Sequence, residues 1–247
     1  MQVETIKEKI MQQISGYLRR AIDDFNMIAP NERVAIALSG GKDSMLLLHA
    51  MKHLSRYHPA KFDLIAIFID LGFNNIDIET MQAECDRLEI PLIIRKTDIA
   101  PLVFDIRKES NPCALCAKMR RGSIHDAAIE NGCRTIALGH HRDDAVETFA
   151  MNLLYEGRIG CFQPVTYLDR KDVRAIRPMI YLSEQQIENA VRKLNIPIVK
   201  NPCPMDHQSM RKETTDLLKE AEERFPNLNE RLFGAIQRSE LAGWKKD

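Results

Sequence analysis

The feature that most constrains the fold of this chain is a six-residue glycine loop, Ser39-Gly40-Gly41-Lys42-Asp43-Ser44. Val34 to Leu38, directly before the loop, is a short continuous apolar run of the kind that forms a buried strand. After the loop, apolar residues return at helical spacing between residues 45 and 51. Glycine tolerates positive φ and lets the backbone approach a ligand closely, and a helix N-terminus leaves N–H groups unpaired. This strand–loop–helix unit therefore predicts an anion-binding site at the end of a buried strand.

The alternation of apolar runs and amphipathic stretches continues along the chain and predicts an α/β fold. Four more runs are expected to be strands: Phe62 to Ile69, Leu92 to Ile94, Thr135 to Leu138 and Val173 to Ile176. Helices are expected at about 3–27, 43–56, 76–88, 144–155, from Ser183 onward, 208–223 and 227–241. We therefore predict a Rossmann-like, parallel five-stranded sheet with helices on both faces. An N-terminal helix (1–28) would precede the main domain (29–205), and a helical extension (206–247) would follow it.

The charge balance bears on the partners of the protein. Lys plus Arg number 35 and Asp plus Glu number 35, so the formal net charge is zero. A protein that holds nucleic acid through its overall field is normally basic, so an RNA partner would need a local basic patch. No apolar run reaches the roughly 18 residues of a membrane-spanning helix, and the first residues mix both charges, unlike a signal peptide. We expect a cytoplasmic protein without a membrane partner.

The spacing within the glycine loop distinguishes it from two other phosphate loops. A Walker A loop has four residues between its first glycine and its Gly-Lys pair, and the dinucleotide fingerprint is G-x-G-x-x-G. The loop instead resembles the PP-loop of the ATP pyrophosphatase superfamily (HUP-type domains), whose members cleave ATP between the α- and β-phosphates and transfer AMP to a carbonyl oxygen. The resemblance implies ATP binding by Ser39, Gly40, Gly41, Lys42, Asp43 and Ser44. Catalytic Lys42 would stabilise charge on the phosphates, and Asp43 would cap the helix or help to hold Mg²⁺.

The same resemblance implies roles for residues at two other strand ends. In that superfamily the adenine lies along the end of the second strand, here Phe68 and Ile69. The segment from Gly139 to Asp144 resembles the second signature of the superfamily, so Gly139 would permit close approach to the nucleotide and His140 would shape the pocket. Asp143 or Asp144 is expected to bind Mg²⁺ or to orient the acceptor, although Asp143 also suits a simple helix cap.

Two short polar segments carry three cysteines: Cys113 and Cys203 each follow an Asn-Pro pair, and Cys116 forms a C-x-x-C pair with Cys113. A C-x-x-C pair alone fits half of a zinc site, a redox dithiol or coincidence. A second C-x-x-C after Cys203 would need a cysteine at Asp206, so a four-cysteine zinc site is excluded, whereas His207 could complete a Cys₃His zinc site. Three thiolates also suit a [4Fe–4S] cluster with one iron left open to an exogenous ligand.

Taken together, these motifs resemble the tRNA 2-thiocytidine synthetases over about residues 30–205. The matching segments are Cys113 to Gly122, Gly139 to Asp144 and Ile176 to Met179. The resemblance implies a [4Fe–4S] cluster on Cys113, Cys116 and Cys203, in a cysteine loop inserted into the main domain. It also implies ATP-dependent thiolation of a pyrimidine in tRNA, at C2 of cytidine, through an adenylated intermediate. A cysteine desulfurase or free sulfide would donate the sulfur, and a homodimer is kept as an option.

Two rival functions remain open on the sequence. The first keeps the adenylation but changes the acceptor to a small molecule or a free nucleobase, and the neutral charge favours it. The second is a non-catalytic iron–sulfur or nucleotide sensor. The basic run Lys118 to Arg121 after the C-x-x-C fits RNA phosphate contacts and the solvated face of a helix equally well.

Overall fold

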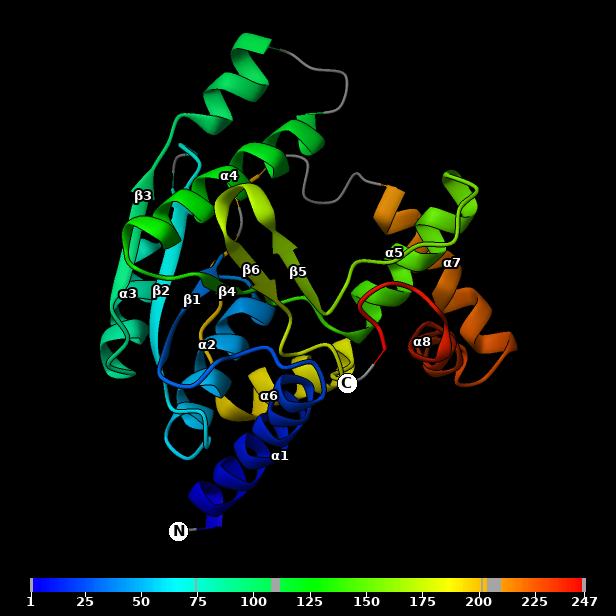
Figure 1. Ribbon diagram of the computed structural model, residues 1–247, viewed down its shortest axis with the longest axis horizontal. Helices are drawn as coiled ribbons and strands as arrows, with labels where there is room; N and C mark the ends of the chain where they lie inside the picture. The colour runs from blue at the N-terminus through cyan, green and yellow to red at the C-terminus, as the bar shows by residue number, and fades with distance from the viewer. Residues whose placement is uncertain (1, 74, 108–111, 201, 204–209, 246–247) are drawn as a thin grey trace.

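The computed structural model describes residues 2–73, 75–107, 112–200, 202–203 and 210–245. Within them the strands form a six-stranded sheet in the order β3-β2-β1-β4-β6-β5 (Figure 1). The strands are β1 (Glu32–Leu38), β2 (Phe62–Asp70), β3 (Leu92–Lys96), β4 (Thr135–Ala137), β5 (Val165–Leu168) and β6 (Val173–Ile176). The helices are α1 (Gln2–Asp24), α2 (Lys42–Ser55), α3 (Ile78–Arg87), the π-helix η1 (Pro101–Arg107), α4 (Pro112–Glu130), α5 (Arg142–Tyr155), the 3₁₀ helix η2 (Asp169–Lys171), α6 (Glu184–Leu194), α7 (Met210–Arg224) and α8 (Leu228–Arg238).

The five predicted strands form the parallel part of the sheet, but the prediction missed a sixth strand. β1 pairs in parallel with β2 and β4, and β3 and β6 extend the sheet on either side. The missed strand, β5, pairs antiparallel with β6 at the edge of the sheet. It is only four residues long and half exposed, with Tyr167 facing solvent. It therefore lacks the continuous apolar run that identifies a strand buried on both faces.

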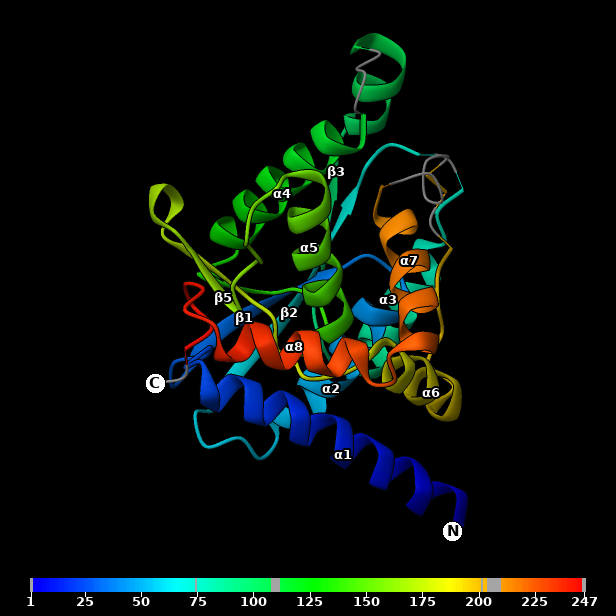
Figure 2. The same ribbon diagram turned by 90° about the vertical axis from the view of Figure 1, so that its right-hand side faces the viewer.

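Helices cover both faces of the sheet, as predicted (Figures 1 and 2). Alternate residues of β1 point to opposite sides, because side chains in a strand alternate. Val34 and Ile36 join the apolar core shared with α1, α2, α5, α6 and α8. Ala35 joins a second, smaller core on the other face with α4 and η1. The larger core also contains Trp244, so helices from both termini pack on the same side of the sheet.

Two predicted local features differ in the structure. Cys113 and Cys116 were expected in a loop, but they lie in the first turns of α4, which begins at Pro112. Proline is favoured in the first turn of a helix because its missing N–H would be unpaired there in any case. The strand-like run 196–199 forms no strand, yet the Val199 N–H donates to the Gly40 carbonyl at 2.9 Å. The division at residues 28 and 205 stays a prediction. None of the helices in the described residues combines the length and apolarity that crossing a bilayer requires.

Candidate functional site

The glycine loop joins the end of β1 to the start of α2, as predicted. Gly40 adopts φ +82°, a conformation that favours glycine. A Cβ on Gly40 would lie 2.8 Å from Cβ of Val199, so the close approach of that segment also requires glycine. Ser44 Oγ accepts from the Ser39 N–H at 3.1 Å and donates to the Gly41 carbonyl at 3.0 Å, which holds the loop closed.

The N-terminus of α2 has no side-chain cap, because Gly41 occupies the N-cap position. The expectation that Asp43 might cap this helix is therefore wrong. Helix N-terminal N–H groups without a capping side chain favour an anion, so the end of α2 suits a phosphate. Gly139, at the end of β4, makes room for this turn, since a Cβ there would lie 3.3 Å from the Ser44 nitrogen.

Lys42 is surrounded by carboxylates. Its Nζ lies 3.1 Å from Oε1 of Glu184 and 3.4 Å from Oδ1 of Asp43. Burial lowers the pKa of Lys42, but the charges of Asp43 and Glu184 outweigh it, so the net pKa is raised and the ammonium form persists. Burial is the main cause that raises the pKa of Asp43. Oδ1 of Asp43 is buried without a hydrogen-bond donor.

His141 lies among three carboxylates at the start of α5. Its Nε2 is 3.4 Å from Asp144 and 3.9 Å from Asp43, and its Nδ1 is 3.7 Å from Asp143. Burial lowers the pKa of His141, but the neighbouring carboxylates Asp143, Asp144 and Asp43 raise it above its ordinary value. His141 is the N-cap residue of α5, and its backbone N–H donates to Asp144 Oδ2 at 2.9 Å. Asp143 is therefore not the cap of α5, so helix capping does not explain why an aspartate stands at this position.

Asp143 instead connects α5 to α6. Its Oδ2 accepts the Glu184 N–H at 2.6 Å, and Arg142 lies 3.6 Å from its Oδ1. Burial raises the pKa of Asp143, but the nearby His141 imidazole, the Glu184 N–H and the charge of Arg142 lower it more, so the net shift is downward and the carboxylate stays ionised.

The C-terminal helix α7 reaches the same carboxylates. Arg211 Nη1 lies 2.7 Å from Asp144 Oδ1 and 3.2 Å from Glu147 Oε2. Thr215 Oγ1 donates to Glu147 Oε1 at 2.7 Å. Burial is the main cause that raises the pKa of Glu147. α7 thus balances part of the negative charge at the start of α5.

His140 lies on the other side of this segment, against an aromatic ring. Its ring centroid is 5.2 Å from that of Phe162, and Arg177 lies 4.7 Å from the Phe162 ring. Burial, assisted by the charge of Arg177, lowers the pKa of His140 to about 4, so the imidazole is neutral. Its Nδ1 is buried without a hydrogen-bond partner. Burial likewise lowers the pKa of Arg177 to about 10.

Phe68 and Ile69 lie near the end of β2, next to β1, and both side chains are buried. Phe68 belongs to the larger core and Ile69 to the smaller one. Contact with adenine therefore stays a prediction for both.

The three cysteines come from two distant parts of the chain. Cys113 is exposed, whereas Cys116 and Cys203 are partly buried. Burial raises the pKa of Cys116, and the nearby Cys203 and Cys113 thiols raise it further, while Arg120 opposes them. Cys203 is thus close enough to the α4 pair to interact with it electrostatically. No group of three ligands at metal-binding distances is found among the described residues, and Asp206 and His207 lie outside them.

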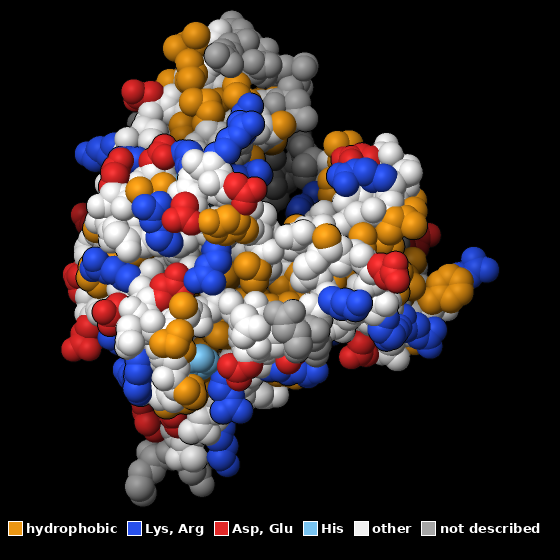
Figure 3. Space-filling view, viewed as in Figure 1, with side chains coloured by type: hydrophobic (Ala, Val, Ile, Leu, Met, Phe, Trp, Pro, Cys, Tyr) orange, Lys and Arg blue, Asp and Glu red, His pale blue; other side chains and the backbone are white. Residues whose placement is uncertain are grey.

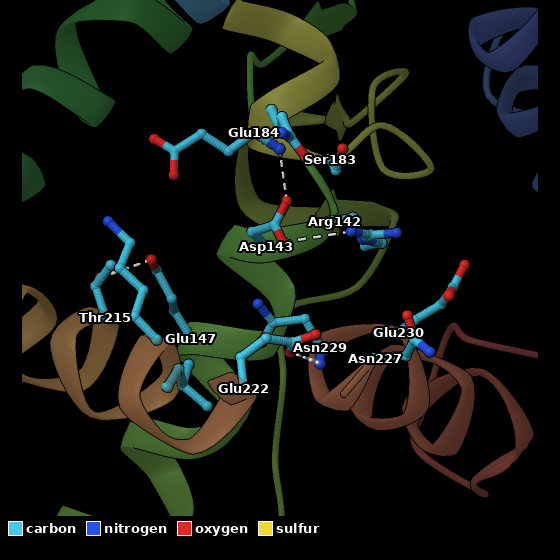
Figure 4. A pocket seen from close by; sticks show the side chains of 13 residues that line it. Arg142, Asp143, Glu147, Ser183, Glu184, Thr215, Glu222, Asn227, Asn229 and Glu230 are labelled. Atoms are coloured by element: carbon cyan, nitrogen blue, oxygen red, sulfur yellow. Dashed lines mark hydrogen bonds and ion pairs between the residues drawn. The ribbon is translucent and has the colours of Figure 1, made fainter. Parts of the chain in front are cut away.

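The structure contains a cavity next to α5 and a surface hollow next to α4. A cavity of about 360 Å³ between α5, α6, α7 and α8 is lined by Asp143, Glu184, Glu147 and Thr215 among others (Figure 4). The surface is also hollowed between α4 and the side of the molecule formed by α5 and α7 (Figure 3). The cavity thus lies next to the predicted site residue Asp143, and the surface hollow borders α4.

Sequence reasoning missed three side chains that contact predicted site residues: Glu184, Arg211 and Val199. Each lies far along the chain from its partner and in a segment that carries no motif. Glu184 was visible only as the first residue after the Ser183 helix cap. His141 belonged to the predicted signature, but the sequence around it did not indicate that three carboxylates would surround its side chain.

Comparison with known proteins supports the motif analysis. The model of the PP-loop domain family matches residues 7–214. A tRNA-cytidine(32) 2-sulfurtransferase of Syntrophotalea carbinolica is 34% identical over 234 residues, covering 94% of this chain and 90% of that protein. One from Geobacter metallireducens is 33% identical, covering 95% of this chain and 92% of its own length. Among solved structures, the U34-tRNA thiolase NcsA from Methanococcus maripaludis with its [4Fe-4S] cluster aligns with a TM-score of 0.78 at 25% identity, covering 94% of this chain and 79% of that one.

Proposed function

The chain belongs to the PP-loop domain family, among the relatives of the tRNA-cytidine(32) 2-sulfurtransferases, and from this membership we propose that it thiolates C2 of a cytidine in tRNA at the expense of ATP. The observation that best supports the proposal is the position of the three cysteines. Cys203 follows Cys116 by 87 residues in the sequence, yet the thiols of Cys203 and Cys113 both raise the pKa of Cys116. The glycine loop and these thiols therefore occur in one fold, in the combination that an adenylating sulfurtransferase needs.

In the first step the chain activates the base. The N-terminus of α2 and the Lys42 side chain hold the phosphates of ATP, and the C2 oxygen of the pyrimidine attacks the α-phosphorus. The new O–P bond replaces the bond to the bridging oxygen of the β-phosphate, and pyrophosphate leaves. Positive groups that are already aimed at the developing charge are often the largest contribution to catalysis. Asp143 stays ionised next to the loop, where a carboxylate can hold Mg²⁺ or orient the acceptor.

A Mg²⁺ ion is part of the proposal. The donor atoms that suit Mg²⁺ are oxygens, and Oδ1 of Asp43 is buried without a hydrogen-bond donor. Asp144 lies near the same ring nitrogen of His141 as Asp43, and Asp143 lies near the other ring nitrogen. These three carboxylates would hold the ion together with the phosphates.

In the second step a sulfur nucleophile attacks C2 and displaces AMP, which carries away the former carbonyl oxygen. The thiol donors of Cys113, Cys116 and Cys203 fit an iron–sulfur cluster, since thiolates are its usual ligands. Such a cluster, bound through three cysteines, supplies a coordination position where inorganic sulfur can be held. Cys113 and Cys116 on α4 would supply two of the ligands, and Cys203, four residues after Val199 in the sequence, would supply the third.

The deciding experiment is anaerobic purification followed by analysis of iron, labile sulfide and zinc, and by assay of tRNA for 2-thiocytidine. We expect about four irons per chain, and thiolation that requires ATP. Cys203→Ala should abolish thiolation but leave ATP binding intact. Cys161→Ala is the matched control, because Cys161 is a partly buried thiol away from the other three in sequence and should not be required.

Three outcomes would contradict the proposal. One zinc per chain in place of iron would favour the Cys₃His site. Unchanged thiolation by Cys203→Ala would remove that residue from the ligand set. ATP binding without any acceptor-dependent release of pyrophosphate would make the protein a sensor.

A further inference from the structure

Glu184, which belongs to none of the recognised motifs, contacts two of the three residues predicted to be catalytic. Its carboxylate Oε1 lies 3.1 Å from Nζ of Lys42. Its backbone N–H donates to Oδ2 of Asp143 at 2.6 Å, the contact drawn between these two residues in Figure 4. Lys42 belongs to the glycine loop and Asp143 to the second signature, so one residue joins the two motifs.

The position of Glu184 is fixed independently of these contacts. Glu184 is the first residue of α6, and Ser183 caps that helix with its Oγ accepting the Gln186 N–H at 3.2 Å. Gln186 Oε1 accepts the Ser183 N–H at 2.9 Å in return, so the capping box is complete without the Glu184 side chain. The Glu184 carboxylate is therefore not needed to begin the helix and is available for Lys42.

Lys42 would be oriented differently without Glu184. The two carboxylates that contact its ammonium are Asp43 from α2 and Glu184 from α6. Asp43 is the next residue in the same loop, so a lysine paired with Asp43 alone is held toward its own helix. Glu184 draws the ammonium across to α6, on the side where Asp143 also lies.

We propose that Glu184 is a positioning residue of the adenylation site, holding the Lys42 ammonium through its carboxylate and the Asp143 carboxylate through its N–H. This inference rests on the proposed function. It predicts an effect on the chemical step more than on ATP binding. The carboxylate fixes where Lys42 meets the charge that develops on the phosphates, while it also repels the anionic nucleotide, so its loss changes ground-state affinity little.

The test is single-turnover release of pyrophosphate from ATP with tRNA as acceptor. Glu184→Gln keeps the N–H that holds Asp143 and removes only the charge. We expect its rate constant at saturating ATP to fall roughly tenfold, the scale of one lost charge-assisted hydrogen bond. The ATP concentration for half-maximal rate should change by less than about threefold. In the pH–rate profile, the fall in rate at alkaline pH (the alkaline limb) should also move to lower pH. The reason is that the Glu184 carboxylate, which raises the pKa of Lys42, is removed in this variant.

Two further variants complete the design. Glu188→Gln removes the same charge from an exposed position one turn along α6 and should behave as the wild type. Glu184→Asp keeps the charge but shortens the side chain, so its rate should lie between those of the wild type and Glu184→Gln, with an alkaline limb near that of the wild type. This variant keeps the inference testable if Glu184→Gln does not fold.

The outcomes separate the inference from the function on which it rests. If the wild type releases no tRNA-dependent pyrophosphate, the proposed function fails. If the wild type is active and Glu184→Gln matches its rate and pH profile, Glu184 does not position Lys42. A variant that melts earlier and needs more ATP, but keeps the wild-type rate at saturation and the wild-type alkaline limb, assigns Glu184 a structural role only and also overturns the inference.

Discussion

His140 and His141 are neighbours in the sequence, yet their environments shift their pKa values in opposite directions. His141 lies among the carboxylates Asp43, Asp143 and Asp144, and these raise its pKa despite burial. His140 packs on Phe162 near Arg177, and burial there lowers its pKa to about 4. The pair illustrates how the position of an imidazole relative to one strand end decides the direction in which its pKa shifts.

The neutral state of His140 has a consequence for stability. Its pKa in the folded protein is about 4, below the ordinary value of 6.5, so between these values the unfolded chain binds more protons. The stability contributed by neutral His140 is therefore present above pH 6.5 and is lost as pH falls toward 4. Between pH 7.5 and pH 5 the loss should be about 2 kcal/mol.

Urea unfolding at these two pH values measures that loss. His140→Gln cannot be protonated and should lose about 2 kcal/mol less than the wild type over the same interval. Asp144, Arg211 and Arg177 face the same ring, and they are present in both proteins, so their contribution largely cancels. Equal losses in the two proteins would show that His140 is accessible to protons in the folded state.

The elements that hold the site were predicted unequally well, for physical reasons. The strand before the glycine loop and the capping box of α6 are local patterns, and the structure contains both. The edge strand β5 and the helical start of α4 were missed, because a half-exposed strand and an Asn-Pro-Cys segment resemble a loop in sequence. The contacts of Glu184, Arg211 and Val199 depend on packing between distant segments, which no local pattern contains.

Gly40 is the point where one such packing contact can be tested. An alanine there would have to adopt φ near +82° and would place its Cβ 2.8 Å from Val199. The backbone conformation alone costs about 1–2 kcal/mol in a residue other than glycine. We expect Gly40→Ala to lower the melting temperature and to weaken ATP binding by at least about tenfold, the equivalent of 1.4 kcal/mol.

Gly41→Ala is the control for that experiment. Gly41 has φ −70°, and the nearest atom to a Cβ there is Ser39 Oγ at 3.6 Å, an ordinary contact. Its melting temperature should stay close to that of the wild type. If Gly40→Ala were as stable as Gly41→Ala, Val199 would be free to move away from the loop.

At the scale of the whole molecule, the net charge of zero means that any RNA partner is held by a patch and not by the overall field. Lys118, Arg120 and Arg121 are exposed on α4, which borders the hollow in Figure 3.

Salt titration of tRNA binding tests this patch. We expect binding at low salt, and the double variant Arg120→Gln/Arg121→Gln should reduce the slope of log affinity against log salt by about 2. The control is Lys9→Gln/Arg19→Gln, which changes the net charge equally on α1, an element that packs in the core on the opposite face of the sheet. Absence of tRNA binding by the wild type would favour a small acceptor molecule.

The hydrogen bond between Val199 and Gly40 also bears on how such a protein can evolve. It joins the glycine loop to a segment that reaches Cys203 four residues later in the sequence. The loop and this segment are thus not exchangeable independently of each other, because the size of residue 199 is matched to the absence of a side chain at residue 40. A chimera that takes residues 196–203 from a relative with a bulkier residue at this position should fail unless the loop is exchanged with it.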